Sequence, residues 1–126
     1  MRRLHSGKGP DLCERTFQFG VRITKMVRRL LRDVAGHEIG RQVLRSGTSV
    51  GANTEEADAA ESTEDFIHKL KIALKEAQET RFWLRNIRES ELLVEQQVDS
   101  LLQEINELIK ILNTIIAVTT NKMNAR

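Results

Sequence analysis

The sequence predicts an all-α protein, folded as an up-down-up-down antiparallel four-helix bundle. Apolar residues recur in steps of four and three through four successive segments, and only short breaks separate these segments. Such spacing places one apolar stripe along each helix, and helices joined by short links fold back on one another to bury their stripes. The chain has 126 residues, so one domain over residues 11–120 can be stable without disulfides.

The first helix is expected from about residue 11 to residue 35. Asp11, followed by Glu14 three positions later, resembles a capping box at the start of a helix. Gly36 suits the left-handed conformation in which many helices end. Residues 1–10 are rich in basic residues and glycine, and they are expected to form a flexible basic tail.

The second helix is expected over about residues 37–60, although its middle contains few strong helix formers. Gly47 and Gly51 would each cost about 1 kcal/mol relative to alanine, but they lie on one face that another helix can approach closely. A buried polar side chain at Asn53 would need hydrogen-bond partners. We therefore expect a close-packed helix pair with a charge-assisted structural network rather than a catalytic site. The members of this network are Arg45, Ser49, Asn53 and Glu56.

The third and fourth helices complete the bundle. Ser62, followed by Asp65, gives the N-terminal signal of a helix that extends to about Glu89. The fourth helix is expected over about residues 94–120, and residues 121–126 are expected to fray.

The fourth helix carries more apolar residues than a four-helix core requires. A second apolar stripe recurs at seven-residue intervals beside the stripe that faces the core. An exposed second stripe would form an adhesive patch, so we expect a homo-oligomer. The alternative is a fourth helix that is buried on three sides within the monomer. The predicted oligomer interface consists of Leu102, Ile109 and Ile116.

The polar stretch of the second helix also carries a resemblance to a known family. The run over residues 45–57, followed by residues 66–70 and 76–84, resembles the bacterial four-helix-bundle family encoded within 23S rRNA intervening sequences. That family includes proteins similar to the accessory variability factor of diversity-generating retroelements. The similarity covers about residues 11–118. It implies a homopentameric ring without established enzymatic activity, and the retroelement relatives engage a reverse transcriptase and nucleic acid.

Charge is distributed unevenly along the chain, although the net charge is only +2. Residues 1–50 hold 11 Lys and Arg against 4 Asp and Glu, a balance of +7, whereas residues 51–126 hold 9 against 14, a balance of −5. Basic residues gather on the side of the first helix opposite its apolar stripe. A row of cationic groups can follow a nucleic-acid backbone. This row, named the basic stripe, consists of Arg15, Arg22, Lys25, Arg28, Arg29 and Arg32.

Two functions remain open at this point. In the first, the chain is a non-enzymatic oligomer that binds the backbone of RNA or DNA through the basic stripe, beside a reverse transcriptase or another nucleic-acid enzyme. Such binding would be tolerant of sequence and strongly dependent on salt. In the second, the chain is a protein–protein interaction scaffold without a nucleic-acid role, and acidic residues of the same bundle neutralise the basic stripe.

No catalytic, metal or cofactor site is expected. Asp65 and His68 form the only approximation to the Glu-x-x-His pairs of di-iron bundles. The lone Cys13 cannot form an intrachain disulfide, which favours a reducing compartment. The chain begins without a signal-peptide core and contains no long uninterrupted apolar run. We therefore expect a cytoplasmic protein without membrane contact.

Overall fold

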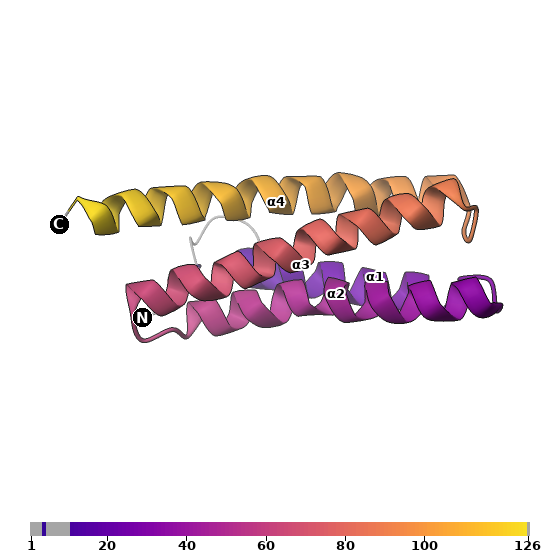
Figure 1. The fold of residues 1–126 in the computed structure, drawn as a ribbon, viewed down its shortest axis with the longest axis horizontal. Coiled ribbons are helices and arrows are strands. Elements are labelled where there is room, and N and C mark those ends of the chain that lie inside the picture. Colours follow the sequence, from indigo (N-terminus) through magenta and orange to yellow (C-terminus); the bar gives the residue numbers. More distant parts are fainter. Residues whose placement is uncertain (1–3, 5–10, 126) are drawn as a thin grey trace.

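The computed structural model describes Leu4 and residues 11–125 of the chain. This part contains four helices and no strand, and consecutive helices run antiparallel, as the sequence predicts (Figure 1). Helices α1 and α2 pack on each other, as do α2 and α3, and α3 and α4, whereas α1 and α4 meet only sparsely. The position of α1 is therefore set mainly by α2. The helices are α1 (Leu12–Val27), α2 (Val34–Asp58), α3 (Thr63–Glu89) and α4 (Glu95–Asn124).

The predicted apolar stripes face one another and form a continuous core. Each large apolar side chain that is fully buried stabilises the fold by roughly 1.5–3 kcal/mol relative to its exposed state. The largest of these side chains come from all four helices: Phe19, Ile23, Val43, Val50, Leu70, Leu84, Ile87, Val98, Ile105, Leu108 and Leu112.

Two helix starts follow the predicted capping chemistry. The Glu14 amide donates to Asp11 Oδ1 at 2.8 Å, and the Asp65 amide donates to the Ser62 hydroxyl at 3.0 Å. Both contacts satisfy backbone groups that a helix leaves without partners in its first turn. The predicted starts of α1 and α3, and the end of α3 at Glu89, are confirmed.

The predicted end of the first helix is wrong, because α1 stops at Val27 and the chain turns before α2 begins at Val34. Asp33 is the N-cap of α2, and its Oδ1 accepts from the Gly36 amide at 2.7 Å. Gly36 therefore belongs to the first turn of α2 and ends no helix. A Cβ atom at Gly36 would lie 1.8 Å from the Leu31 carbonyl oxygen, so only glycine lets the turn pass this closely.

The α3–α4 connection contains a turn that composition alone does not reveal. The Leu92 amide donates to the Ile87 carbonyl at 3.2 Å, and the Glu91 amide donates to the Arg88 carbonyl at 3.2 Å. This pair of bonds is a Schellman motif, with Glu91 at a φ of 60° in the position where glycine is usual.

Helix α4 continues to Asn124, four residues past its predicted end, and its C-terminal end projects beyond the other helices (Figure 1). The predicted flexible tail over residues 1–10 lies outside the described residues, apart from Leu4. Leu4 is buried, and its amide donates to Asp58 Oδ1 at 3.0 Å.

Helices α1 and α2 form the predicted close-packed pair, and Gly47 and Gly51 of α2 lie at its contact. A Cβ atom at Gly47 would lie 2.9 Å from two side-chain carbons of Ile23. A Cβ atom at Gly51 would lie 3.1 Å from the Thr16 carbonyl oxygen. These distances are shorter than ordinary contacts, so the missing side chains allow α1 to approach α2.

We predict that Gly36→Ala lowers the free energy of unfolding, although alanine is the better helix former by about 1 kcal/mol. The new Cβ would meet backbone, which cannot rotate aside, so urea unfolding should show a net loss of about 1–3 kcal/mol. Gly20→Ala is the control, because the nearest atom to its Cβ would lie 3.6 Å away. That substitution should raise stability by up to about 1 kcal/mol. Equal effects at the two positions would contradict the structure of the α1–α2 turn.

Candidate nucleic-acid interface

Arg15 is paired with acidic residues of α4 and does not belong to a free cationic surface. Its Nη2 and Nε donate to the two carboxylate oxygens of Glu104 at 2.7 and 3.1 Å, and Nη2 also donates to Glu107 at 3.1 Å. The hydrogen bond to Glu104 is the main reason why the pKa of Arg15 lies above its usual range. Among the residues of the predicted basic stripe, Arg15 is the one that pairs with carboxylates of other described residues.

Arg22, Lys25 and Arg29 form a cationic site in a hollow between α1 and α4. All three side chains are exposed, and Arg22 donates to the Ser100 hydroxyl at 2.6 Å. None of them pairs with a carboxylate of another described residue. The hollow, named the α1–α4 cationic site, has a volume of about 180 Å³. It is lined by Arg22, Lys25, Met26, Arg29, Leu93, Gln97 and Leu101.

Arg28 and Arg32 lie past the end of α1 and face a different hollow, between α1 and α2. Arg28 caps the C-terminus of α1, and Arg32 lies in the turn that follows. The second hollow has a volume of about 390 Å³ and also includes His37 and Arg41 of α2. The predicted basic stripe lacks His37 and Arg41, because a helical projection of the first helix cannot include residues of the second. Their four-residue spacing, which places both on one helix face, is the signal that could have found them.

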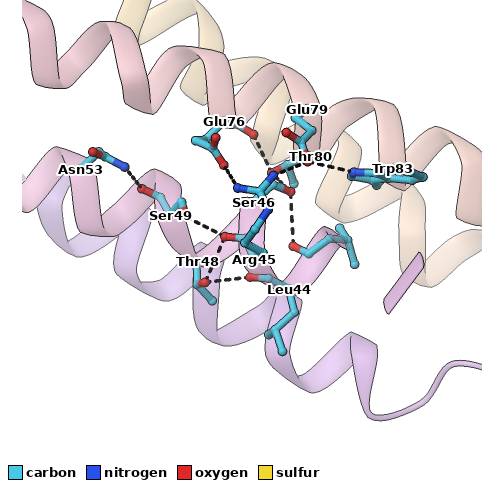
Figure 2. A network of polar contacts seen from close by, with 11 residues as sticks. Leu44, Arg45, Ser46, Thr48, Ser49, Asn53, Glu76, Glu79, Thr80 and Trp83 are labelled. Atoms are coloured by element: carbon cyan, nitrogen blue, oxygen red, sulfur yellow. Dashed lines mark hydrogen bonds and ion pairs between the residues drawn. The ribbon is translucent and has the colours of Figure 1, made fainter. Parts of the chain in front are cut away.

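The predicted polar network is in part a bridge between α2 and α3 (Figure 2). Arg45 donates to Glu76 at 2.8 Å and also to Glu79. Trp83 donates its ring N–H to the same oxygen of Glu79 at 3.1 Å. Inside the bundle, the hydroxyls of Ser46 and Thr80 lie 2.9 Å apart, and both residues are fully buried. These contacts hold α2 against α3 at about mid-length.

The other predicted members make different contacts. The Ser49 hydroxyl donates to the Arg45 carbonyl at 2.7 Å, and the Asn53 amide donates to the Ser49 carbonyl at 2.9 Å, so both side chains bind the backbone of their own helix (Figure 2). Glu56 instead accepts from Lys69 at 2.9 Å. Arg45 and Glu56 therefore form ion pairs with residues of α3, whereas Ser49 and Asn53 bind the backbone of α2.

The predicted oligomer interface on α4 is also wrong for two of its three residues. Leu102 and Ile109 are 7% and 6% exposed and belong to the core of the monomer. Ile116 is half-buried. Exposed apolar surface lies instead in a groove of about 390 Å³ between α1 and α2, where Phe17 is 55% exposed. This apolar groove is lined by Thr16, Phe17, Gly20, Val21, Thr24, Thr48, Gly51, Ala52 and Glu55.

The part of the chain that the structure describes contains no group of three or more His, Cys, Asp or Glu side chains that could hold a metal ion. Cys13 is buried, and His68 is exposed on α3. Within Leu4 and residues 11–125, no helix is both long enough and apolar enough to cross a membrane.

Together these features define an antiparallel four-helix bundle with cationic residues at the end where α1 turns into α2. Residues 10–114 match the family model of the 23S rRNA-intervening sequence protein, and the chain belongs to this family. A crystal structure of a protein with unknown function from the S23 ribosomal protein family of Bacteroides thetaiotaomicron is similar, with 40% sequence identity and a TM-score of 0.78. That similarity covers 83% of this chain and 97% of the other. Comparison with curated proteins gives no match.

We predict that Glu79→Gln destabilises the bundle in a pH-dependent manner. Burial alone raises the pKa of Glu79, but hydrogen bonds from Arg45 and Trp83 outweigh it and hold this pKa below its usual range. A lowered folded-state pKa stabilises the protein above the unfolded-state pKa, near 4.3, and this contribution disappears as the pH falls through the folded-state value. The variant should be less stable by under about 1 kcal/mol near neutral pH, and the difference should be smaller at about pH 3.

Urea unfolding at the two pH values measures this difference. Glu61→Gln is the control, because Glu61 is exposed and has no ion pair with another described residue. A stability difference for Glu79→Gln that is undiminished at about pH 3 would show that the ion pair with Arg45 is not its cause.

Proposed function

We propose that this chain is a non-enzymatic helical-bundle protein that binds the phosphate backbone of RNA or DNA in the cytoplasm. One observation carries the proposal. At the end of α1, four neighbouring cationic side chains are exposed and have no carboxylate partner among the described residues. Cationic groups that neutralise phosphates release bound counterions, and this release drives sequence-independent binding. The four side chains are Lys25, Arg28, Arg29 and Arg32.

The chemistry of the α1–α4 cationic site supports backbone binding rather than base recognition. Its lining contains no aromatic side chain on which a base could stack. Arg22 is already held by Ser100, so less side-chain freedom is lost when it meets a phosphate. Binding through this site would tolerate any sequence and would weaken steeply with salt. A role beside a reverse transcriptase or another nucleic-acid enzyme, which the resemblance to retroelement proteins implies, is part of this proposal.

We predict that replacing Arg22, Lys25 and Arg29 together by Glu weakens binding to labelled RNA and DNA by more than about tenfold at low salt. Fluorescence anisotropy at about 50 and 200 mM salt measures both the affinity and its salt dependence. The control replaces Lys71, Lys75 and Arg85 by Glu, because this makes the same change of charge at exposed positions of α3. Unchanged affinity in the first variant, or an equal loss in the control, would contradict the assigned site.

We also propose that the chain self-associates, as the resemblance to ring-forming relatives implies, and that each copy places the projecting end of α4 in the apolar groove of the next. Both surfaces are apolar: Phe17 of the groove is 55% exposed, and Val118 on the α4 end is 46% exposed. Their charges are complementary, because Glu55 lines the groove and Lys122 is exposed near the end of α4. A contact between two different surfaces of identical chains forms a ring when its rotation closes. Such a ring, a homopentamer by resemblance, would multiply the cationic sites.

We predict that Phe17→Glu dissociates the oligomer, because it places a charge in the apolar groove. Size-exclusion chromatography with light scattering measures the mass. Phe82→Glu is a matched control, since Phe82 is also 55% exposed but lies on α3, outside the groove. A monomeric parent protein, or a Phe17→Glu variant of unchanged mass, would contradict this mode of assembly.

A further inference from the structure

We propose that the hollow between α1 and α2 is a second phosphate-binding site, and that a bound strand crosses the end of α1 to reach it. This extension rests on the proposed function, since it concerns the same nucleic-acid ligand. The site, named the α1–α2 cationic pocket, combines residues from the end of α1, from the turn and from α2. Its charged or ionisable lining residues are Arg28, Arg32, His37 and Arg41.

The local backbone explains why these side chains share one pocket. The chain reverses over residues 28–33, so the end of α1 lies beside the first turns of α2. Gly36 and Gly40 line the pocket from α2, and both are buried. Because neither has a side chain, the turn and the end of α1 pack closely against α2 here: a Cβ atom at Gly40 would lie 3.4 Å from side-chain carbons of Leu30 and Val27. The hollow beside this contact has a volume of about 390 Å³. Pockets of about 300–1,000 Å³ are large enough for small-molecule groups of nucleotide size.

The pocket is suited to an anion. Arg28, Arg32 and Arg41 are exposed and form no ion pair with another described residue. Asp33 and Glu38 are the acidic residues of this stretch, and neither lines the pocket. Asp33 is moreover engaged as the N-cap of α2. A guanidinium fork binds phosphate oxygens in pairs, so three arginines around one hollow can hold a phosphodiester in a defined orientation.

The two cationic hollows determine the path of the strand. Arg29 lines the α1–α4 cationic site and Arg28 lines the α1–α2 cationic pocket, so consecutive residues face opposite sides of the end of α1. A polynucleotide that contacts both sites must cross the α1–α2 turn rather than follow α1 along its length. A single nucleotide can occupy only one of the two sites, so binding should require a strand that is long enough to span them.

Arg41 provides the sharpest test, because it lies on α2, is exposed and is absent from the α1–α4 cationic site. We predict that Arg41→Glu weakens binding of a labelled single-stranded RNA more than about fivefold, and lowers the salt dependence of log K by roughly 0.7, as expected for one lost phosphate contact. Arg41→Lys should keep most of the contribution that Arg41 makes to the salt dependence, whereas Arg41→Gln should lose that contribution. Arg85→Glu, on α3, is the control and should change little. Circular dichroism confirms that each variant is folded.

Comparison of Arg41→Glu with the triple variant distinguishes a failure of the α1–α2 cationic pocket from a failure of the proposed function. Losses in both Arg41→Glu and the triple variant at Arg22, Lys25 and Arg29 support a strand that crosses the turn. Loss in the triple variant alone overturns the α1–α2 cationic pocket and leaves the proposed function intact. Loss in Arg41→Glu alone supports the pocket and overturns the crossing path. A parent protein that binds no RNA or DNA at low salt overturns both proposals.

Discussion

The close approach of α1 to α2 is the constraint on which the functional surface depends. Helix α1 is the shortest of the four, with 16 residues, and it contacts α4 only sparsely. Its position is therefore determined by α2, where Gly47 and Gly51 leave room for Ile23 and for the backbone of Thr16. The glycines weaken α2 as an isolated helix, and packing against α1 offsets this loss. The cationic residues of α1 are therefore positioned mainly by this contact, and side chains of α4 also hold Arg15 and Arg22.

The turn after α1 converts a row of basic residues into a two-sided surface. Leu30 is buried although it lies three residues past the last residue of α1, so the turn after α1 is anchored in the core. The Leu31 amide donates to the Leu92 carbonyl at 3.3 Å, which joins the α1–α2 turn to the α3–α4 turn. The arginines at positions 28 and 32 therefore face α2, whereas Arg29 faces α4. The fold thus distributes cationic groups around the end of α1.

The sequence predicts the helices well because periodicity and N-terminal caps are local signals. It fails where the outcome depends on distant contacts. The apolar steps continue through Leu30 and Val34, yet Val34 is 80% exposed, so periodicity alone cannot reveal the end of α1. Arg15 meets Glu104 across 89 positions, a pairing that no spacing rule predicts. Likewise, a helical projection shows two apolar stripes on α4, but it cannot show that Leu102 is already covered within the monomer.

The most direct test of the α1–α2 contact is a double-mutant cycle between Gly47 and Ile23, measured by urea unfolding. Gly47→Ala should destabilise the parent protein, because the new methyl group meets the branched side chain of Ile23. In a background that carries Ile23→Ala, the same substitution should be neutral or stabilising, with a coupling free energy of about 1–2 kcal/mol. An identical effect of Gly47→Ala in both backgrounds would contradict the account, because it would mean that α1 is not held against this face of α2.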